Sequence, residues 1–336
     1  MWRTHYKIEF FNKIILTEQK EYLRDYSKNL LQSLRVSILF HPMFSLKKIF
    51  FTIFGILLLG LLSAAYYFSS LVLYPNVRCS KEHHVFCETP GELGLPYEVV
   101  SFPTEDGLNL EAYYIQHNKT NKSILLVHGH GGQKNEGLRF AKSLYGAGYN
   151  LLLLSLRRNH GGFASMGYHE QKDVKAALEF LESKGQTSIG IFGFSMGSAT
   201  SIIAMDKNKN IKAGLFSSGY GSALDVLVES AQRDFGIPYY PLIPLVKLFI
   251  NVRGDLDIES VRPIDSIGNI SPRPIAIFHC DADDYVDHHH ALDLFAKAKE
   301  PKSIWSPACT RHERIWNVYP KESETRAVEF FSKNLN

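Results

Sequence analysis

The 336-residue sequence lacks several features that mark common classes of protein. It has no block of Lys and Arg with interleaved aromatic residues, and its formal net charge is only +3. Nucleic acid is therefore not an expected partner. We also find no internal repeat, no low-complexity tract and no Gly-rich phosphate loop. Hydrophobic residues make up 45% and charged residues 21%, which is ordinary for a folded protein with a sizeable core.

Cysteine is scarce as well. The four cysteines are Cys79, Cys87, Cys280 and Cys309. An even number favours pairing in an oxidising compartment, whereas free thiols are expected in a reducing one. Four cysteines allow three ways of pairing, and spacing alone does not choose between them.

Charge is absent from one long stretch near the N-terminus. From Ile49 to Tyr74 the sequence reads "IFFTIFGILLLGLLSAAYYFSSLVLY", and about 20 apolar residues are enough to cross a bilayer. A signal peptide would have an apolar region of roughly 7–15 residues close to the N-terminus, whereas here 48 residues come first. We therefore predict an uncleaved transmembrane anchor over residues 49–74.

Basic residues are distributed unevenly about this predicted anchor. Residues 1–48 contain nine Lys and Arg, and the ten residues after Tyr74 contain two. The positive-inside rule then predicts a cytoplasmic N-terminal segment over residues 1–48 and places residues 78–336 on the other side, which is periplasmic or luminal. Before the anchor, "NLLQSLRVSILF" fits an amphipathic helix that lies on the membrane, or one that packs on the anchor or a partner.

The remaining sequence alternates between strand and helix patterns. We assign residues 75–94 to a linker and residues 95–336 to one α/β domain. A hairpin is expected around "PTEDG", and apolar strands such as "SILLVHG" and "SIGIFGF" are separated by helices of 10–15 residues. This pattern predicts a mostly parallel sheet covered on both faces. Residues 219–270 are too long for a simple crossover and predict a cap insertion. Its apolar residues either line a substrate pocket or only pack against the core.

A serine lies between two glycines in "FGFSMGSAT", directly after one of these strands. Ligands of such sheets bind outside the carboxyl ends of the strands. Ser195, the "HGHGG" segment after Val127 and the acidic turn "HCDADDYVD" after residue 278 all fall at such ends. A late histidine, His312, follows in "CTRHERIW". The chain order is thus Ser, Asp, His.

With these motifs, the sequence resembles the α/β-hydrolase fold superfamily over about residues 95–335. It looks most like membrane-anchored serine hydrolases of the esterase/lipase-like or oligopeptidase-like kind. The resemblance implies that Ser195 is the nucleophile, that His312 is its general base and that an Asp orients the histidine. It also implies an oxyanion hole formed by the backbone N–H groups of Met196 and His130.

The acidic turn offers three candidates, Asp281, Asp283 and Asp284. In the resembling family the turn often reads His-Gly-x-x-Asp-x-x-Val, and this pattern assigns the acid to Asp283, with Cys280 in place of the glycine. The resemblance also implies that the strands before Cys280 and Cys309 are neighbours. A Cys280–Cys309 disulfide, together with Cys79–Cys87, is therefore one hypothesis, and four free thiols are the alternative.

The predicted function is a membrane-anchored serine hydrolase that cleaves carboxylic esters, with lipid-like esters among the candidate substrates, and without a cofactor. An oligopeptidase-like amide hydrolase and a non-catalytic binding module are the alternatives. The consecutive His288, His289 and His290 are not expected to bind a metal, because neighbouring residues of a helix point in different directions.

Other polar residues have simpler interpretations. We expect His128 to hold its loop by hydrogen bonds, and we interpret Glu170 and Asp173 as charges in the first turn of a helix. Arg157 lies in a loop where family members often have Asp-x-Arg, but Ser155 occupies the place of the Asp. A local salt bridge of Arg157 is therefore left open.

Overall fold

The computed structural model describes residues 46–76, 89–117, 120–312 and 315–335. The predictions for residues 29–40 and for Cys79 and Cys87 lie outside these ranges. Internal contacts divide the chain into two compact units, residues 1–61 and residues 62–336.

Helix α2 runs over Leu46–Leu73. Within the described residues, it is the one helix that is long and apolar enough to cross a membrane, with a mean hydropathy of 2.3. All side chains from residue 47 to residue 60 are exposed, so this part of the helix presents apolar groups on every side. A helix that is apolar all round suits a lipid environment. The structure therefore has a membrane-length helix at the position predicted for the anchor.

The second unit is built on an eight-stranded sheet with the strand order β1-β2-β4-β3-β5-β6-β7-β8. β1 pairs with β2 as the predicted hairpin, β2 pairs antiparallel with β4, and every other pairing is parallel. The strands are β1 (Glu98–Pro103), β2 (Asn109–Ile115), β3 (Lys122–Val127), β4 (Asn150–Leu154), β5 (Ser188–Phe194), β6 (Ile211–Ser217), β7 (Ile275–Phe278) and β8 (Lys302–Trp305).

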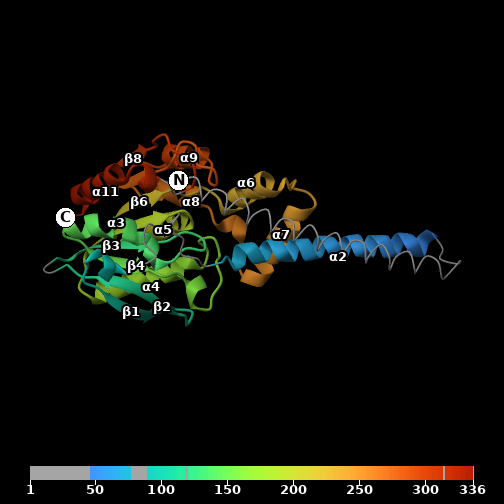
Figure 1. Cartoon of the computed structure of the whole chain (residues 1–336), viewed down its shortest axis with the longest axis horizontal. Coiled ribbons are helices and arrows are strands. Elements are labelled where there is room, and N and C mark those ends of the chain that lie inside the picture. Colours follow the sequence, from blue (N-terminus) through green and yellow to red (C-terminus); the bar gives the residue numbers. More distant parts are fainter. Residues whose placement is uncertain (1–45, 77–88, 118–119, 313–314, 336) are drawn as a thin grey trace, which may run out of the picture. The chain divides into compact units, whose positions relative to one another are not determined.

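Helices cover both faces of this sheet (Figure 1). Strands β4 and β5 are buried along their whole length and β3 from its second residue, and their side chains alternate between two apolar cores. For example, Leu125 and Val127 join the core on one face, and Ile124 and Leu126 join the core on the other. Helices α4 (Glu170–Ser183), α5 (Met196–Lys207) and α9 (His288–Lys297) pack in the first core, and α3 (Leu138–Gly146), α10 (Ile315–Val318) and α11 (Pro320–Asn334) pack in the second. The doubly covered sheet is confirmed.

The chain between β6 and β7 is mainly helical, where a cap insertion was predicted. It contains α6 (Ala223–Phe235), α7 (Leu242–Gly254), the short helices η4 (Ile258–Ser260) and η5 (Ile267–Asn269), and α8 (Pro263–Ser266). The side chain of Ser222 accepts a hydrogen bond from the backbone N–H of Asp225 and so caps the start of α6.

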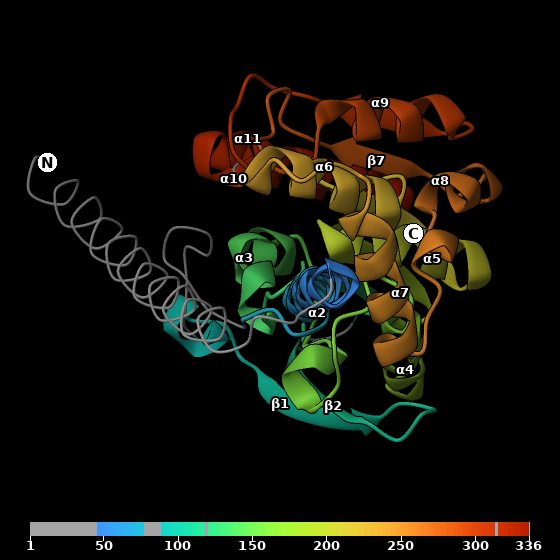
Figure 2. The same cartoon turned by 90° about the vertical axis from the view of Figure 1, so that its right-hand side faces the viewer.

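Within the second unit, α6 and α7 lie beside residues 62–73 of α2 (Figures 1 and 2). Ala65, Ser69 and Leu73 are fully buried, and this spacing of four residues is that of one helix face. Arg253 of α7 donates hydrogen bonds to the carbonyl of Tyr66 and to the hydroxyls of Ser69 and Ser70. The compact unit that contains the sheet starts at residue 62, inside the predicted anchor, and the predicted α/β domain over residues 95–336 lies within it.

Candidate active site

Ser195 lies at a sharp turn between the end of β5 and the start of α5. Its φ is +51°, a left-handed conformation that non-glycine residues rarely adopt and that is often retained at functional sites. The turn brings α5 against the loop after β3, and a Cβ on Gly197 would overlap the carbonyls of Val127 and His128. The two glycines that flank Ser195 are thus required by close backbone approach, since a Cβ on Gly193 would overlap the backbone of Gly197.

The structure brings together the three residues proposed from the sequence for nucleophile, base and acid. Ser195 Oγ lies 2.8 Å from His312 Nε2. On the other side of the imidazole, His312 Nδ1 lies 3.0 Å and 2.9 Å from the two carboxylate oxygens of Asp283. A carboxylate only accepts, so Nδ1 carries the proton and donates it. His312 Nε2 is then free to accept the hydroxyl proton of Ser195.

Asp283 is held as a buried, ionised acid. Its side chain is inaccessible to solvent, and its Oδ1 accepts the backbone N–H groups of Tyr285 and Val286. Burial alone would raise the pKa of Asp283, but His312, His279 and the backbone N–H of Tyr285 hold it below its usual range. A carboxylate that stays charged keeps His312 in one orientation and one tautomer.

The two competing acids have a different role in the structure. Asp281 accepts the backbone N–H of Cys309, and Asp284 accepts the backbone N–H of His312. Both carboxylates therefore tie the turn after β7, residues 279–287, to the segment after β8, residues 306–312. We call these segments the acid loop and the base loop.

A disulfide links the same two loops. Cys280 and Cys309 are bonded, with their Cα atoms 4.9 Å apart, and an isolated parallel bridge pairs Ala282 with Thr310 beside them. The pairing implied by the family resemblance is thus present in the structure. The neighbouring strands β7 and β8 bring the two cysteines to the same edge of the sheet.

The candidate oxyanion hole lies between the start of α5 and the loop after β3. Met196 is the first residue of α5, so its N–H has no acceptor within the helix. The ring of His130 is directed elsewhere, because its Nε2 donates to the Val72 carbonyl at 2.7 Å. His128 is a buried loop residue as expected, since its Nδ1 donates to the Gly129 carbonyl and its Nε2 accepts the N–H of Leu156.

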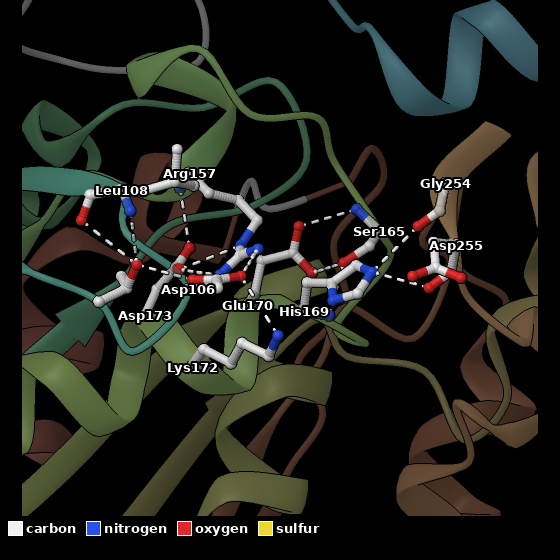
Figure 3. Close-up of polar contacts among 11 residues, drawn as sticks. Asp106, Leu108, Arg157, Ser165, His169, Glu170, Lys172, Asp173, Gly254 and Asp255 are labelled. Atoms are coloured by element: carbon white, nitrogen blue, oxygen red, sulfur yellow. Dashed lines mark hydrogen bonds and ion pairs between the residues drawn. The ribbon is translucent and has the colours of Figure 1, made fainter.

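A buried ion pair anchors the loop after β4 (Figure 3). Arg157 begins the short helix η3 (Arg157–His160). Its side chain donates to Asp173 at 2.7 Å and to Asp106 at 3.0 Å, and its backbone N–H also donates to Asp173. The salt bridge that the sequence left open therefore exists, with an acid 16 residues further along the chain. Asp173 lies in the first turn of α4, as interpreted from the sequence, but its carboxylate is also fully buried and pairs with Arg157.

Glu170 is also more than a charge in the first helical turn. It is fully buried, and its carboxylate accepts the backbone N–H and the hydroxyl of Ser165 (Figure 3). It also accepts the backbone N–H of Gly167. Beside it, His169 Nε2 donates to the carbonyls of Gly254 and Asp255 at the end of α7. Sequence periodicity gave no sign of these roles, because the acceptors and donors belong to irregular loops.

The histidine run at the start of α9 differs from expectation in its geometry. The rings of His289 and His290 do not diverge: their centroids are 4.2 Å apart, and each Nε2 lies 3.1 Å from a carboxylate oxygen of Glu229. Such a trio resembles a metal site. However, His290 Nδ1 accepts the N–H of Gly221, so the proton sits on the Nε2 that faces Glu229. This tautomer donates to the carboxylate and does not suit a metal ligand. The absence of a metal stays a prediction.

Known proteins resemble this chain at low sequence identity. No family model matches it. The uncharacterized protein YqkD of Bacillus subtilis is 24% identical over 309 residues, which cover 87% of this chain and 99% of YqkD. The α/β hydrolase domain-containing protein WAV2 of Arabidopsis thaliana is 26% identical, over 78% of this chain and 84% of its own length. An uncharacterized membrane protein of Saccharomyces cerevisiae, YNL320W, is 23% identical over 48% of this chain and 58% of its own.

A solved structure also matches the fold. The esterase Pf2001 of Pyrococcus furiosus superposes with a TM-score of 0.65 at 22% identity, over 79% of this chain and 99% of the esterase. The strand order, the turn that carries Ser195 and these similarities agree. The chain has the α/β-hydrolase fold, and its relatives and structural neighbours support the α/β-hydrolase superfamily.

Proposed function

We propose that this protein is a membrane-anchored serine hydrolase that cleaves carboxylic esters through Ser195, His312 and Asp283. The observation that carries the proposal is the continuous set of hydrogen bonds from the Ser195 hydroxyl through His312 to the buried Asp283. The resemblance to an esterase supports the same reaction class.

In the proposed first half-reaction, Ser195 Oγ attacks the ester carbonyl while its proton moves to His312 Nε2. The oxyanion that forms is stabilised by the backbone N–H groups of Met196 and His130. The C–O bond to the leaving alcohol then breaks, and His312 gives its proton to the alcohol. This step leaves an acyl group on Ser195. Asp283 stays ionised and stabilises the imidazolium.

In the second half-reaction, water replaces the alcohol. His312 takes a proton from the water, whose oxygen attacks the acyl carbonyl, and the proton then returns to Ser195 Oγ as the carboxylic acid leaves. No step requires a cofactor or a metal ion. Ser195 and His312 act in both half-reactions, so the proposed mechanism needs no residues beyond those described.

A fluorophosphonate probe tests for an activated serine without knowledge of the substrate. We expect the peptide that contains Ser195 to become labelled, as Oγ bonds to phosphorus, fluoride leaves and the proton passes to His312. Labelling of a His312→Gln variant should be slower by about 10²- to 10⁴-fold, because the hydroxyl has lost its base. The measurement is mass spectrometry of the labelled peptide over time.

The matched control for this experiment is His117→Gln. His117 lies after β2, where its ring contacts that of Tyr145 in α3, so its loss should leave the labelling rate unchanged. A non-catalytic binding module would show no labelling of Ser195 in the wild-type protein, and that outcome would sink the proposal.

The proposal includes a location for the hydrolase unit on the non-cytoplasmic side. The nine-to-two asymmetry of Lys and Arg about α2 supports this orientation, and so does the Cys280–Cys309 disulfide, because disulfides persist in oxidising compartments. In protein taken from its native membrane under non-reducing conditions, we expect peptide mapping to recover Cys280 joined to Cys309.

Protease added to sealed vesicles of known orientation provides an independent control of the topology. We expect cleavage of the hydrolase unit from the non-cytoplasmic side only. Alkylation of free Cys280 and Cys309 in active protein, together with protection from that protease, would contradict the proposed orientation.

A further inference from the structure

An apolar pocket of about 190 Å³ lies between the cap helices and residues 62–73 of α2. α6 contributes Leu227 and Ala231 to its walls, and α7 contributes Ile243 and Val246. The membrane-length helix contributes Phe68, Leu71 and Val72. All these residues belong to the second compact unit. The same helix that presents apolar residues on every side before residue 61 therefore completes the wall of a pocket after it.

The pocket ends beside the proposed catalytic residues. His130 and Tyr285 also line it. His130 belongs to the candidate oxyanion loop, and the ring of Tyr285 lies 5.2 Å from that of His312. The apolar pocket therefore shares His130 with the candidate oxyanion loop and Tyr285 with the surroundings of His312.

Direct contacts couple the helix to this site. Val72, in the last turn of α2, accepts the hydrogen bond from the ring of His130, and its neighbour Leu73 accepts the backbone N–H of Ala164. Carbonyls in the last turn of a helix have no intrahelical donors. The end of the helix is therefore fastened to the loops that surround the candidate site.

The length of the helix sets how near the pocket lies to lipid. The apolar residues that precede the second unit, Ile49 to Leu61, extend about 20 Å at the rise of an α-helix. This length falls short of the hydrocarbon core of a bilayer, which is about 30 Å thick. A complete span needs helix residues that pack on the cap. The cap also exposes large apolar side chains, Phe235, Tyr240, Leu248 and Val252, which suit contact with a membrane.

We infer that the C-terminal half of the membrane helix is part of the substrate site, and that the pocket holds the acyl chain of an ester that resides in the bilayer. This inference rests on the proposed function and specifies its substrate class. The ester carbonyl lies at Ser195, and the chain extends between Leu71, Val246 and Ala231.

Esters of increasing chain length test the inference in the full-length protein in bilayer nanodiscs. Each buried methylene should raise kcat/KM by about fourfold until the pocket is full, so p-nitrophenyl octanoate should exceed the acetate by more than tenfold. Leu71→Trp should fill the pocket and lower kcat/KM for the octanoate at least tenfold, with the acetate changed less than threefold. The control Tyr67→Trp places the same side chain at an exposed position of the same helix and should leave kcat/KM unchanged for both esters.

A matched pair on the cap makes the same test from the opposite wall. Ala231→Phe should act like Leu71→Trp, whereas Gln232→Phe, at the next and exposed position of α6, should have no effect. Equal losses for acetate and octanoate in both pocket variants would mean that these residues only support the fold, and would overturn the inference. Octanoate turnover that is unchanged in both variants would overturn it as well.

A second measurement does not depend on the folding of a variant. An alkyl fluorophosphonate with a diazirine at the end of its chain should bond to Ser195 in the wild-type protein and crosslink, on illumination, to peptides from residues 62–73 or from α6 and α7. Crosslinks confined to other elements would overturn the inference while the labelling of Ser195 upheld the proposed function. Failure to label Ser195 at all would refute both.

Discussion

Replacing Ser195 with alanine is expected to lower kcat/KM for short p-nitrophenyl esters by at least about 10⁴-fold, with the fold intact. The hydroxyl is the atom that bonds to the substrate, and losses of this order follow when a member of such a unit is removed. The change deletes one oxygen and adds no atom, so the melting temperature should stay close to that of the wild-type protein. Steady-state kinetics and thermal unfolding measure the two effects.

Ser198→Ala is the matched control. Ser198 is also buried and lies one turn further along α5, and its hydroxyl has no hydrogen-bond partner within the described part of the chain. Removal of this hydroxyl should leave kcat/KM within about twofold of the wild-type value. Wild-type turnover in Ser195→Ala would discard the assignment of Ser195 as the nucleophile.

The largest expected loss of stability comes from Arg157→Met. The side chain of Arg157 and the carboxylate of Asp173 are 5% and 0% exposed. Burial raises the pKa of Asp173 to about 7 even with Arg157 beside it, and removal of the arginine would leave this buried carboxyl group without its partner. Such losses cost about 3–5 kcal/mol, which corresponds to a fall in melting temperature of roughly 10 °C for a domain of this size. Thermal or urea unfolding of the full-length protein in detergent measures the effect.

Two variants separate this explanation from a general loss of packing. Arg157→Met with Asp173→Leu removes both charges and should recover most of the stability. Lys175 lies on the same helix as Asp173, and Lys175→Met removes its ion pair with Glu105 of the β1–β2 turn. These two side chains are about half exposed, so the cost should stay below about 1 kcal/mol. A double variant as unstable as the single one would contradict the explanation.

The arrangement of the sheet could be predicted from the sequence because its strands are apolar and its motifs have a fixed order. Strand β5 and the two glycines about Ser195 indicated the sharp turn, and the family pattern selected Asp283 among three acids. The roles of Asp281 and Asp284 could not be predicted, since both accept backbone N–H groups of a loop about 28 residues away. A local sequence pattern does not indicate a contact between residues so far apart in the chain.

Two other features escaped prediction for related reasons. Asp173 has the sequence position of a helix-start charge, and only the course of the loop after β4 brings Arg157 to it. The rings of His289 and His290 were expected to diverge, but both turn toward Glu229 of the cap. In each case a side chain on one element is oriented by a partner on another, and hydrophobic periodicity contains no information about that partner.

The packing of α7 on the membrane-length helix has a consequence for how the protein is made. Arg253 has its guanidinium over the ring of Tyr66 at 4.0 Å and donates to three acceptors on α2. Residues 62–73 therefore belong both to the proposed membrane segment and to the core of a domain whose last strand is synthesised some 230 residues later. The domain cannot finish folding around this segment until the cap helices, which come later in the sequence, have been synthesised. A shortened chain that starts after residue 75 would leave Arg253 without these acceptors and uncover the apolar face that Leu73 now fills. Under the proposed anchoring, membrane insertion and folding of the hydrolase-fold unit are successive stages of one process, with these twelve residues in common.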